Sequence, residues 1–401
     1  MLHRLPAYLL VALIPFLPAC AGRAVPAPPT AGGEQPAPAA AAAVEGINPA
    51  WRHTGRSRVT VGQRAMVVSG SPIASQVGAD VLRRGGNAVD AAVAVGFALA
   101  VVHPEAGNIG GGGFMVIRMR DGDVSAIDYR EVAPGRATRD MYLDVNGNPS
   151  SLSITGHLAA GVPGAVAGML EAHRRFGKLS RADVIEPAVR LASDGFLVDS
   201  FRFRSIESDR ERLYLFPGSR QAFLPDSGGH APAPGSTWRQ PDLGRTLAAI
   251  RDQGRDGFYR GRVADLIVAE MERGGGIISH ADLESYRAEW REPIRISYRG
   301  HTIYSMPPAS SGGVTMGEIF NILEGYDPLP RFGTSELLHL EAEAMRRAFT
   351  DRNIHLGDPA FVTMPLDRLL SKEYAATLRA QIGERASKTA PFDPSLPRGA
   401  S

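Results

Sequence analysis

Arg130 is the residue whose position best suits the binding of a charged substrate. It closes a strand-like run over residues 123–130 and is followed by Glu131 and the pair Ala133-Pro134. A guanidinium at a strand end can donate two parallel hydrogen bonds to a carboxylate, which makes it a suitable anchor for an amino-acid substrate. An arginine in this place can also be a surface charge or the partner of a nearby acid such as Glu131. The residues alone leave these alternatives open.

The other reactive side chains lack the settings that catalysis needs. Ser310 and Ser311 are not in a G-x-S-x-G turn, the motif that presents a nucleophilic serine. The ten histidines show neither an H-E-x-x-H pair nor another zinc spacing. Three of them lie in or beside predicted helices, where we expect core or surface positions: His103, His173 and His339. We expect no catalytic nucleophile, no metal site and no organic cofactor in this chain.

A glycine-rich segment over residues 107–113 resembles a phosphate-binding loop only superficially. No Lys-Ser or Lys-Thr pair follows the glycines, and they precede a strand rather than a helix. Glycine lacks a Cβ atom, so such a segment lets two backbone segments approach each other closely. We therefore expect a structural role for it, before the hairpin that follows.

The first twenty residues have the pattern of an export signal. His3 and Arg4 precede an apolar run over residues 5–17, which is too short to cross a bilayer core of about 30 Å as a helix. The following Leu-Pro-Ala-Cys resembles a bacterial lipobox, in which the cysteine, here Cys20, becomes lipidated. The alternative is an ordinary signal peptide that contains a cysteine. We expect an exported lipoprotein of a Gram-negative bacterium, periplasmic or at the outer membrane and attached by its lipid alone.

Composition divides the rest of the chain. Residues 21–58 are rich in Ala and Pro and cannot bury enough apolar surface to offset their ordering entropy, so we expect a flexible tether. Residues 59–385 carry alternating helix and strand signals and should form the folded region. Residues 386–401 lose this periodicity and read as a loose end. Cys20 is the only cysteine, which excludes an intrachain disulfide, and a net charge of +2 without a basic stripe argues against nucleic-acid binding.

The folded region mixes helices with antiparallel hairpins. Asp121-Gly122 predicts a hairpin over residues 114–130, and Arg299-Gly300 predicts a second one over 294–306. A short apolar strand is expected at 65–69. Helices are expected at 75–84, at 87–102 as an apolar and therefore buried helix, up to about 177, from 180, from 279 and after 313. The pairs Asn87 with Asp90, Ser180 with Asp183 and Ser279 with Asp282 predict capped helix starts. A further helix is expected over 335–350, with Leu338, Met345 and Phe349 facing the core. This order indicates a mixed α/β fold rather than a Rossmann sheet.

Several motifs follow one another as they do in γ-glutamyltransferases, so the folded region resembles that family. In order along the chain they are GGNAVDAA (85–92), GNIGGGGF (107–114), DYREVAP (128–134), GVPG (161–164), PPASSGG (307–313), DR (351–352) and GDP (357–359). The resemblance runs from about residue 59 to about residue 380. A series of motifs in the right order is far more specific than any one of them.

The resemblance implies a fold, a chemistry and one residue role. The fold is that of N-terminal-nucleophile hydrolases, an αββα sandwich of which this chain is the large-chain part. In such enzymes a precursor cleaves itself, and the small chain begins with the catalytic Thr. Its hydroxyl attacks a γ-glutamyl amide such as glutathione, and the acyl group then passes to water or an amine. In the family, the arginine that matches Arg130 binds the α-carboxylate of the γ-glutamyl group.

The sequence also departs from the family pattern. The family's processing point, a Thr-Thr-His motif, is absent from this sequence, which ends at Ser401. We therefore expect a large chain that is inactive alone and needs the small chain as its partner. Two alternatives stay open: a relative that acts on other acyl groups, and a non-catalytic amino-acid- or peptide-binding lipoprotein derived from the enzyme.

Overall fold

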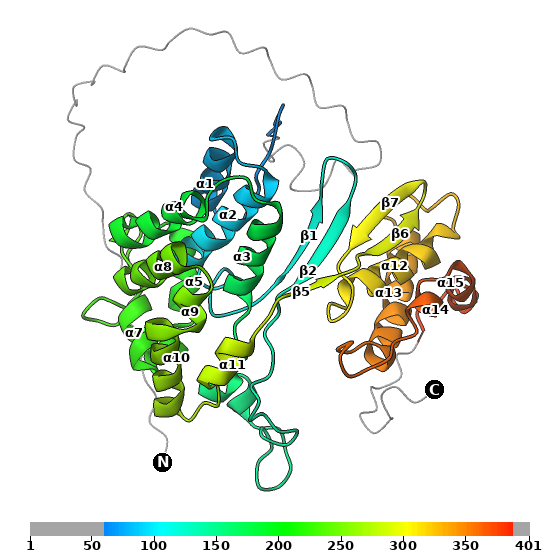
Figure 1. Ribbon diagram of the computed structural model, residues 1–401. Helices are drawn as coiled ribbons and strands as arrows, with labels where there is room; N and C mark the ends of the chain where they lie inside the picture. The colour runs from blue at the N-terminus through cyan, green and yellow to red at the C-terminus, as the bar shows by residue number, and fades with distance from the viewer. Residues whose placement is uncertain (1–59, 388–401) are drawn as a thin grey trace, which may run out of the picture. The chain divides into compact units, whose positions relative to one another are not determined.

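The computed structural model describes residues 60–387 (Figure 1). The expected signal peptide with Cys20, the tether over residues 21–58 and nearly all of the expected loose end lie outside these residues. No helix of the described part is long and apolar enough to span a membrane. The described residues hold helices and short antiparallel strands, as the hairpin signals predicted.

Helix α2 (Ala88–Val102) is the centre of the larger of the two helical regions. Its side chains are mostly Ala, Val, Leu and Phe, and nearly all of them are buried, including Phe97. Helices α1 (Pro72–Arg83), α3 (Ala165–Phe176) and α4 (Arg181–Asp194) pack around it. A helix that is apolar all round needs such neighbours, so the prediction of a buried helix at 87–102 is confirmed.

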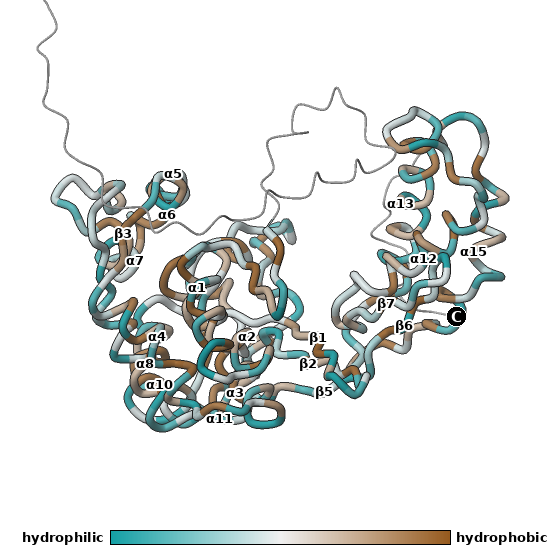
Figure 2. Tube along the Cα trace, turned by 90° about the horizontal axis from the view of Figure 1, so that it is seen from above, coloured by the Kyte–Doolittle hydropathy of each residue, from teal (hydrophilic) through white to brown (hydrophobic). Residues whose placement is uncertain are grey.

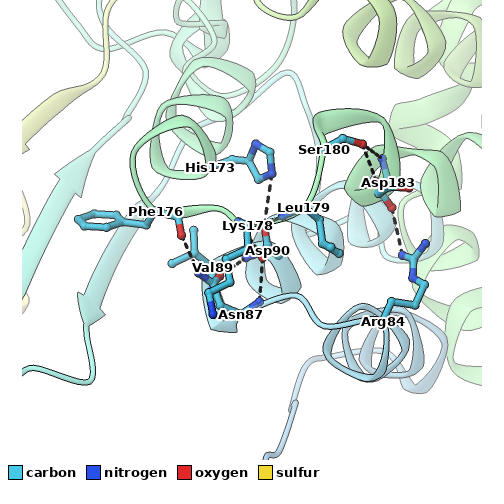
Figure 3. A network of polar contacts seen from close by, with 10 residues as sticks. All are labelled: Arg84, Asn87, Val89, Asp90, His173, Phe176, Lys178, Leu179, Ser180 and Asp183. Carbon is cyan, nitrogen blue, oxygen red and sulfur yellow. Dashed lines mark hydrogen bonds and ion pairs between the residues drawn. The ribbon is translucent and has the colours of Figure 1, made fainter.

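The ends of these helices are joined by a polar network around Asp90 (Figure 3). Asp90 is fully buried, and its carboxylate accepts hydrogen bonds from the backbone N–H groups of Asn87 and Lys178 at 2.8 and 3.0 Å. The Asn87 amide donates to the carbonyl of Phe176 at 2.6 Å, and the His173 ring lies 3.3 Å from Asp90. The predicted capping box therefore caps α2 and also fixes the turn between α3 and α4.

The remaining elements of this region are the helices α8 and α10 and a set of shorter pieces. They surround α1 to α4, and β3 and β4 among them form a two-stranded antiparallel sheet. Their bounds are: η1 Ser151–Ser153, η2 His157–Ala159, β3 Phe196–Leu197, α5 Ser200–Ser208, α6 Arg210–Tyr214, α7 Pro217–Phe223, β4 Thr237–Trp238, α8 Pro241–Gln253, α9 Asp256–Tyr259, α10 Gly261–Gly274 and α11 His280–Ser285. Helix α8 packs on α4, and α11 begins at the predicted Ser279–Asp282 capping box.

A three-stranded antiparallel sheet lies beside α3. Strands β1 (Phe114–Arg118), β2 (Val124–Asp128) and β5 (Glu289–Arg291) follow in this order, with Ile127 opposite Met115 on one side and Trp290 on the other. The Asp121-Gly122 turn joins β1 to β2, with Gly122 at a φ of 102°. The predicted first hairpin is confirmed, and its second strand leads directly to Arg130.

The glycine-rich segment lets backbone pack on backbone at the start of this hairpin. A Cβ atom on Gly112 would lie 2.5 Å from the carbonyl oxygen of Tyr129, closer than any real contact. The carbonyl of Gly111 accepts hydrogen bonds from the N–H groups of Gly164 and Ala165 at the start of α3. This close packing supports the expected structural role of the segment, rather than a phosphate-binding one.

The second helical region follows β5. Strands β6 (Ile294–Tyr298) and β7 (His301–Ser305) form the predicted second hairpin, with Arg299 and Gly300 at φ values of 46° and 79°. Two small apolar clusters hold this hairpin and its helices together. The helices are α12 Gly312–Glu324, α13 Ser335–His355, α14 Leu366–Leu369 and α15 Lys372–Arg379.

Two predictions about elements were wrong. Residues 65–69 form no strand: Val67 packs on the core, but no described strand lies beside this segment to complete a ladder. On α13, the predicted core-facing residues Leu338, Met345 and Phe349 are 58%, 48% and 51% exposed. The buried face is offset by one residue and carries Leu337, Ala344 and Ala348. Helix α13 is apolar on two faces, and the sequence pattern does not say which one its own chain covers.

Candidate functional site

The main chain of Arg130 is held tightly just beyond the end of β2. Its N–H group donates to Oδ1 of Asp128 at 3.1 Å, and its carbonyl accepts a hydrogen bond from the Tyr286 hydroxyl at 2.8 Å. Asp128 is itself buried and paired with Arg291 of β5 at 2.9 Å. Contacts from β2, β5 and Tyr286 thus hold the main chain from which the Arg130 side chain extends.

The guanidinium of Arg130, by contrast, has no hydrogen-bond or ion-pair partner among the described residues. Glu131, the acid proposed as its partner, is not paired with it. Its Cζ atom lies 5.8 Å from the centroid of the Phe114 ring. A cation on an ordered backbone with free donors can bind an external carboxylate.

Arg130 lines a polar pocket of about 520 Å³ together with residues from the second helical region. The other lining residues come from the segment before α12 and from the end of α13: Ala309, Ser310, Ser311, Arg352, Asn353, Leu356 and Gly357. Two guanidinium groups on one pocket make it attractive to anions. Of the residues singled out in the sequence, the structure brings together Arg130, Ser310 and Ser311.

The two serines have no base beside them in the described part of the chain. Oγ of Ser311 accepts a hydrogen bond from Nε of Arg352 at 3.0 Å, and Oγ of Ser310 accepts from the N–H group of Gly312 at 3.3 Å. A nucleophilic hydroxyl needs a group that takes its proton, and an arginine donates instead. The expectation that neither serine is a nucleophile is consistent with these contacts.

A buried pair of acids lies behind the pocket. Glu318 of α12 is 1% exposed, and Asp351 precedes Arg352 on α13. Burial and a hydrogen bond to Asp351 raise the pKa of Glu318 to about 9. The Tyr374 hydroxyl donates to Asp351 at 2.7 Å. A neutral Glu318 can therefore donate a hydrogen bond to the side chain of Asp351, which joins α12 to α13 near the pocket.

The three histidines singled out in the sequence lie away from the pocket. His103 contacts Glu105 at 3.1 Å and Arg202 at 2.8 Å, His173 belongs to the Asp90 network, and His339 lies 2.7 Å from the carbonyl of Gly383. Within the described residues, no group of three or more His, Cys, Asp or Glu side chains is arranged to hold a metal ion.

Three residues of the site could not be assigned to it from the sequence. Tyr286 and the buried Glu318 carry no motif of their own, and the sequence alone does not show that they contact Arg130 and Asp351. Arg352 was noted only as part of a motif, although an arginine in the last turn of a helix before Gly357-Asp358-Pro359 signals a helix end beside a loop. These residues become visible only when distant segments are brought together.

Comparisons with known proteins agree with the geometry. A family model described as Gamma-glutamyltranspeptidase matches residues 74–400. The glutathione hydrolase proenzyme of Pseudomonas sp. (strain A14) is 47% identical over 352 residues, which make up 85% of this chain and 60% of the relative. The acylase ACY 1 proenzyme of Pseudomonas sp. (strain V22) is 42% identical over 344 residues, 84% of this chain and 61% of the relative.

A solved structure matches the fold closely. The crystal structure of Helicobacter pylori gamma-glutamyltranspeptidase aligns with a TM-score of 0.82 and 42% identity, covering 86% of this chain and 100% of that chain. The present chain spans only about 60% of the length of the curated relatives named above.

Proposed function

Since the chain belongs to the gamma-glutamyltranspeptidase family, we propose that it is the substrate-carboxylate-binding part of an enzyme that hydrolyses and transfers γ-glutamyl groups. Its fold is the large-chain part of the αββα sandwich of N-terminal-nucleophile hydrolases, as the resemblance implied. The observation that carries the proposal is the unpaired Arg130 guanidinium on an ordered strand end, facing a polar pocket.

Arg130 has the chemistry to bind and orient the substrate. Its paired N–H donors match the α-carboxylate of a γ-glutamyl group, and a bidentate pair fixes direction as well as distance. Once the carboxylate is anchored, the γ-carbonyl lies a fixed number of bonds away, which favours a single position for attack. Glutathione and related γ-glutamyl amides are the substrates that fit this anchor.

The nucleophile in this proposal is the Thr of a small chain. The Thr hydroxyl adds to the γ-carbonyl. The hydroxyl proton passes to the departing amine by way of the α-amino group that cleavage of the precursor leaves on this Thr. The resulting ester is cleaved by water in hydrolysis or by an acceptor amine in transfer. No metal or organic cofactor enters these steps.

The exposed apolar face of α13 supports the need for such a partner. Leu338, Met345 and Phe349 lie on one face of this helix and are each about half exposed. Apolar side chains that gather on one face mark a surface that another chain covers. The relatives named above are proenzymes, which fits a precursor that supplies both chains. We propose the small chain as the partner for this face.

An acylase of the same family is the second candidate, because the acylase ACY 1 relative is 42% identical. The two candidates differ in whether their substrate must carry a carboxylate for Arg130 to bind. A γ-glutamyl substrate carries a free α-carboxylate for this guanidinium, whereas other acyl groups need not. The choice of substrate therefore tests the role of Arg130 directly.

The test uses the protein from the full reading frame, with Arg130→Ala and Arg130→Lys variants. Loss of the anchor should raise KM for γ-glutamyl-p-nitroanilide by about 10- to 100-fold, the range for lost hydrogen bonds to a charged group. Self-cleavage, read as two bands on a denaturing gel, should continue. Arg118→Ala removes another exposed arginine, at the opposite end of the hairpin, and should leave KM unchanged. Unchanged kinetics in both Arg130 variants would contradict the proposal.

A further inference from the structure

A buried tyrosine lies directly behind Arg130. Tyr286 follows α11 in the chain and is 4% exposed, and its hydroxyl donates to the carbonyl of Arg130 at 2.8 Å. The two residues are 156 positions apart, so the contact joins the segment after α11 to the end of β2. Among the described residues, it is the one hydrogen bond to Arg130 that comes from outside its own hairpin.

The ring of Tyr286 is fixed by a second buried tyrosine. Tyr259 stacks on it with ring centroids 5.9 Å apart and planes within 4°. The hydroxyl of Tyr259 donates to the carbonyl of Pro163 at 2.7 Å and accepts from the N–H group of Ala167 at 3.2 Å. Tyr259 is thereby tied to the start of α3, and it holds the Tyr286 ring in one plane.

The main chain around Tyr286 is fixed as well. One guanidinium nitrogen of Arg255 donates to the carbonyls of Glu284 and Tyr286, each at 2.8 Å, while its Cζ atom lies 4.6 Å from the Tyr259 ring centroid. With both its ring and its backbone held, Tyr286 can direct its hydroxyl in only one direction, toward the strand end.

The surroundings of this hydroxyl are shaped to leave it room. A Cβ atom on Gly164 would lie 2.1 Å from the Tyr286 hydroxyl and 2.1 Å from the carbonyl oxygen of Tyr129. Only glycine fits there. Burial raises the pKa of Tyr286, so the hydroxyl stays protonated as a donor.

We propose that Tyr286 is a positioning residue for substrate binding, which holds the Arg130 peptide so that the guanidinium meets the α-carboxylate. The Arg130 side chain is exposed and has no described partner, so its direction depends on the backbone from which it extends. The Tyr286 hydroxyl holds the carbonyl on one side of Arg130, and Asp128 holds the N–H group on the other. The inference rests on the proposed function of Arg130 as a carboxylate anchor.

The test is Tyr286→Phe in the complete two-chain enzyme, which removes the hydroxyl and keeps the stacked ring. We expect KM for γ-glutamyl-p-nitroanilide to rise about three- to tenfold, since a net hydrogen bond of this kind corresponds to that range. The kcat should stay within about twofold, and inhibition by L-glutamate should weaken by the same factor as substrate binding. A purely structural role would not move binding separately from turnover.

Tyr142→Phe is the matched control, because it removes a tyrosine hydroxyl that also donates to a backbone carbonyl, that of Leu158 at 2.9 Å, and that has no contact with Arg130 or Tyr286. It should lower the melting temperature and leave KM unchanged. Equal KM changes in both variants, or an unchanged KM in Tyr286→Phe while Arg130→Ala raises it, would overturn the inference alone. An unchanged KM in Arg130→Ala would contradict the proposed role of Arg130 itself, and with it the inference that rests on that role.

Discussion

Helices α2 and α13 both carry many apolar side chains, yet their neighbours cover them to different extents. Helix α2 is enclosed by α1, α3 and α4, and Phe97 at its centre is fully buried. Helix α13 packs on α12 with one face and leaves Leu338, Met345 and Phe349 exposed on another. Figure 2 shows this mixture as alternating hydrophilic and hydrophobic segments along α13.

The difference separates a region with a closed core from a region whose apolar face is uncovered among the described residues. The region around α2 has a closed core, and the sheet that carries Arg130 packs beside it through α3. The region around α13 has two small clusters and an apolar face without cover among the described residues. This arrangement fits our proposal of a chain that supplies the substrate anchor and needs a second chain for the rest of its core.

Phe97→Ala tests the closed side of the comparison and should have the largest effect. Truncating a fully buried Phe removes its contacts and leaves a cavity, which costs about 3–5 kcal/mol of unfolding free energy. Urea denaturation followed by circular dichroism measures this loss. A cost below about 1 kcal/mol would mean that the region around α2 is not a closed core.

Glu318→Gln probes the region around α12 and α13 and should have an intermediate, pH-dependent effect. With its pKa raised from 4.5 to about 9, Glu318 keeps its proton in the folded state after the unfolded chain has lost it. Stability therefore falls as pH rises between these values, and below about pH 4.5 the two states no longer differ.

Glutamine keeps the size of Glu318 and a donor to Asp351 but cannot ionise. The variant should be as stable as the parent at pH 4 and more stable at pH 8, by roughly 1–3 kcal/mol. Thermal melts at several pH values measure the difference. Glu373→Gln, at an exposed position on α15, should show no such trend. A gain in stability that is equal at all pH values would contradict the view that Glu318 is a buried neutral acid.

Leu338→Ala tests the open face itself and should have the smallest effect on the chain alone. Leu338 is 58% exposed, so its truncation should change the unfolding free energy by less than about 0.5 kcal/mol. The adjacent Leu337 is buried, and Leu337→Ala should cost about 2–5 kcal/mol in the same urea titration. Equal costs for these neighbours would show that the exposed face is already covered.

Local signals in the sequence predicted most of the fold. The capping pairs at Asn87, Ser180 and Ser279 mark helix starts that the structure confirms, and both hairpins form at the predicted Asp-Gly and Arg-Gly turns. These features depend on residues within a few positions of each other, so they can be read from one stretch of chain.

The sequence did less well wherever a partner element decides the outcome. Residues 65–69 have the composition of a strand but no neighbouring strand, and α13 has two apolar faces of which one is covered. At the site, Arg130 could be predicted as a binding residue from its position at the end of a strand and from the family resemblance. Tyr286 and Glu318 could not, because their roles arise from contacts with distant segments.

We propose above that this chain carries a substrate anchor whose nucleophile belongs to a second chain. The most direct measurement co-expresses it with any coding sequence that follows Ser401 and compares γ-glutamyl-p-nitroanilide release with that of the chain alone. We predict activity in the pair and none in the chain alone. Activity of the chain alone, or silence in both while glutamate still binds the isolated chain, would contradict the account, and the second result would favour a binding protein.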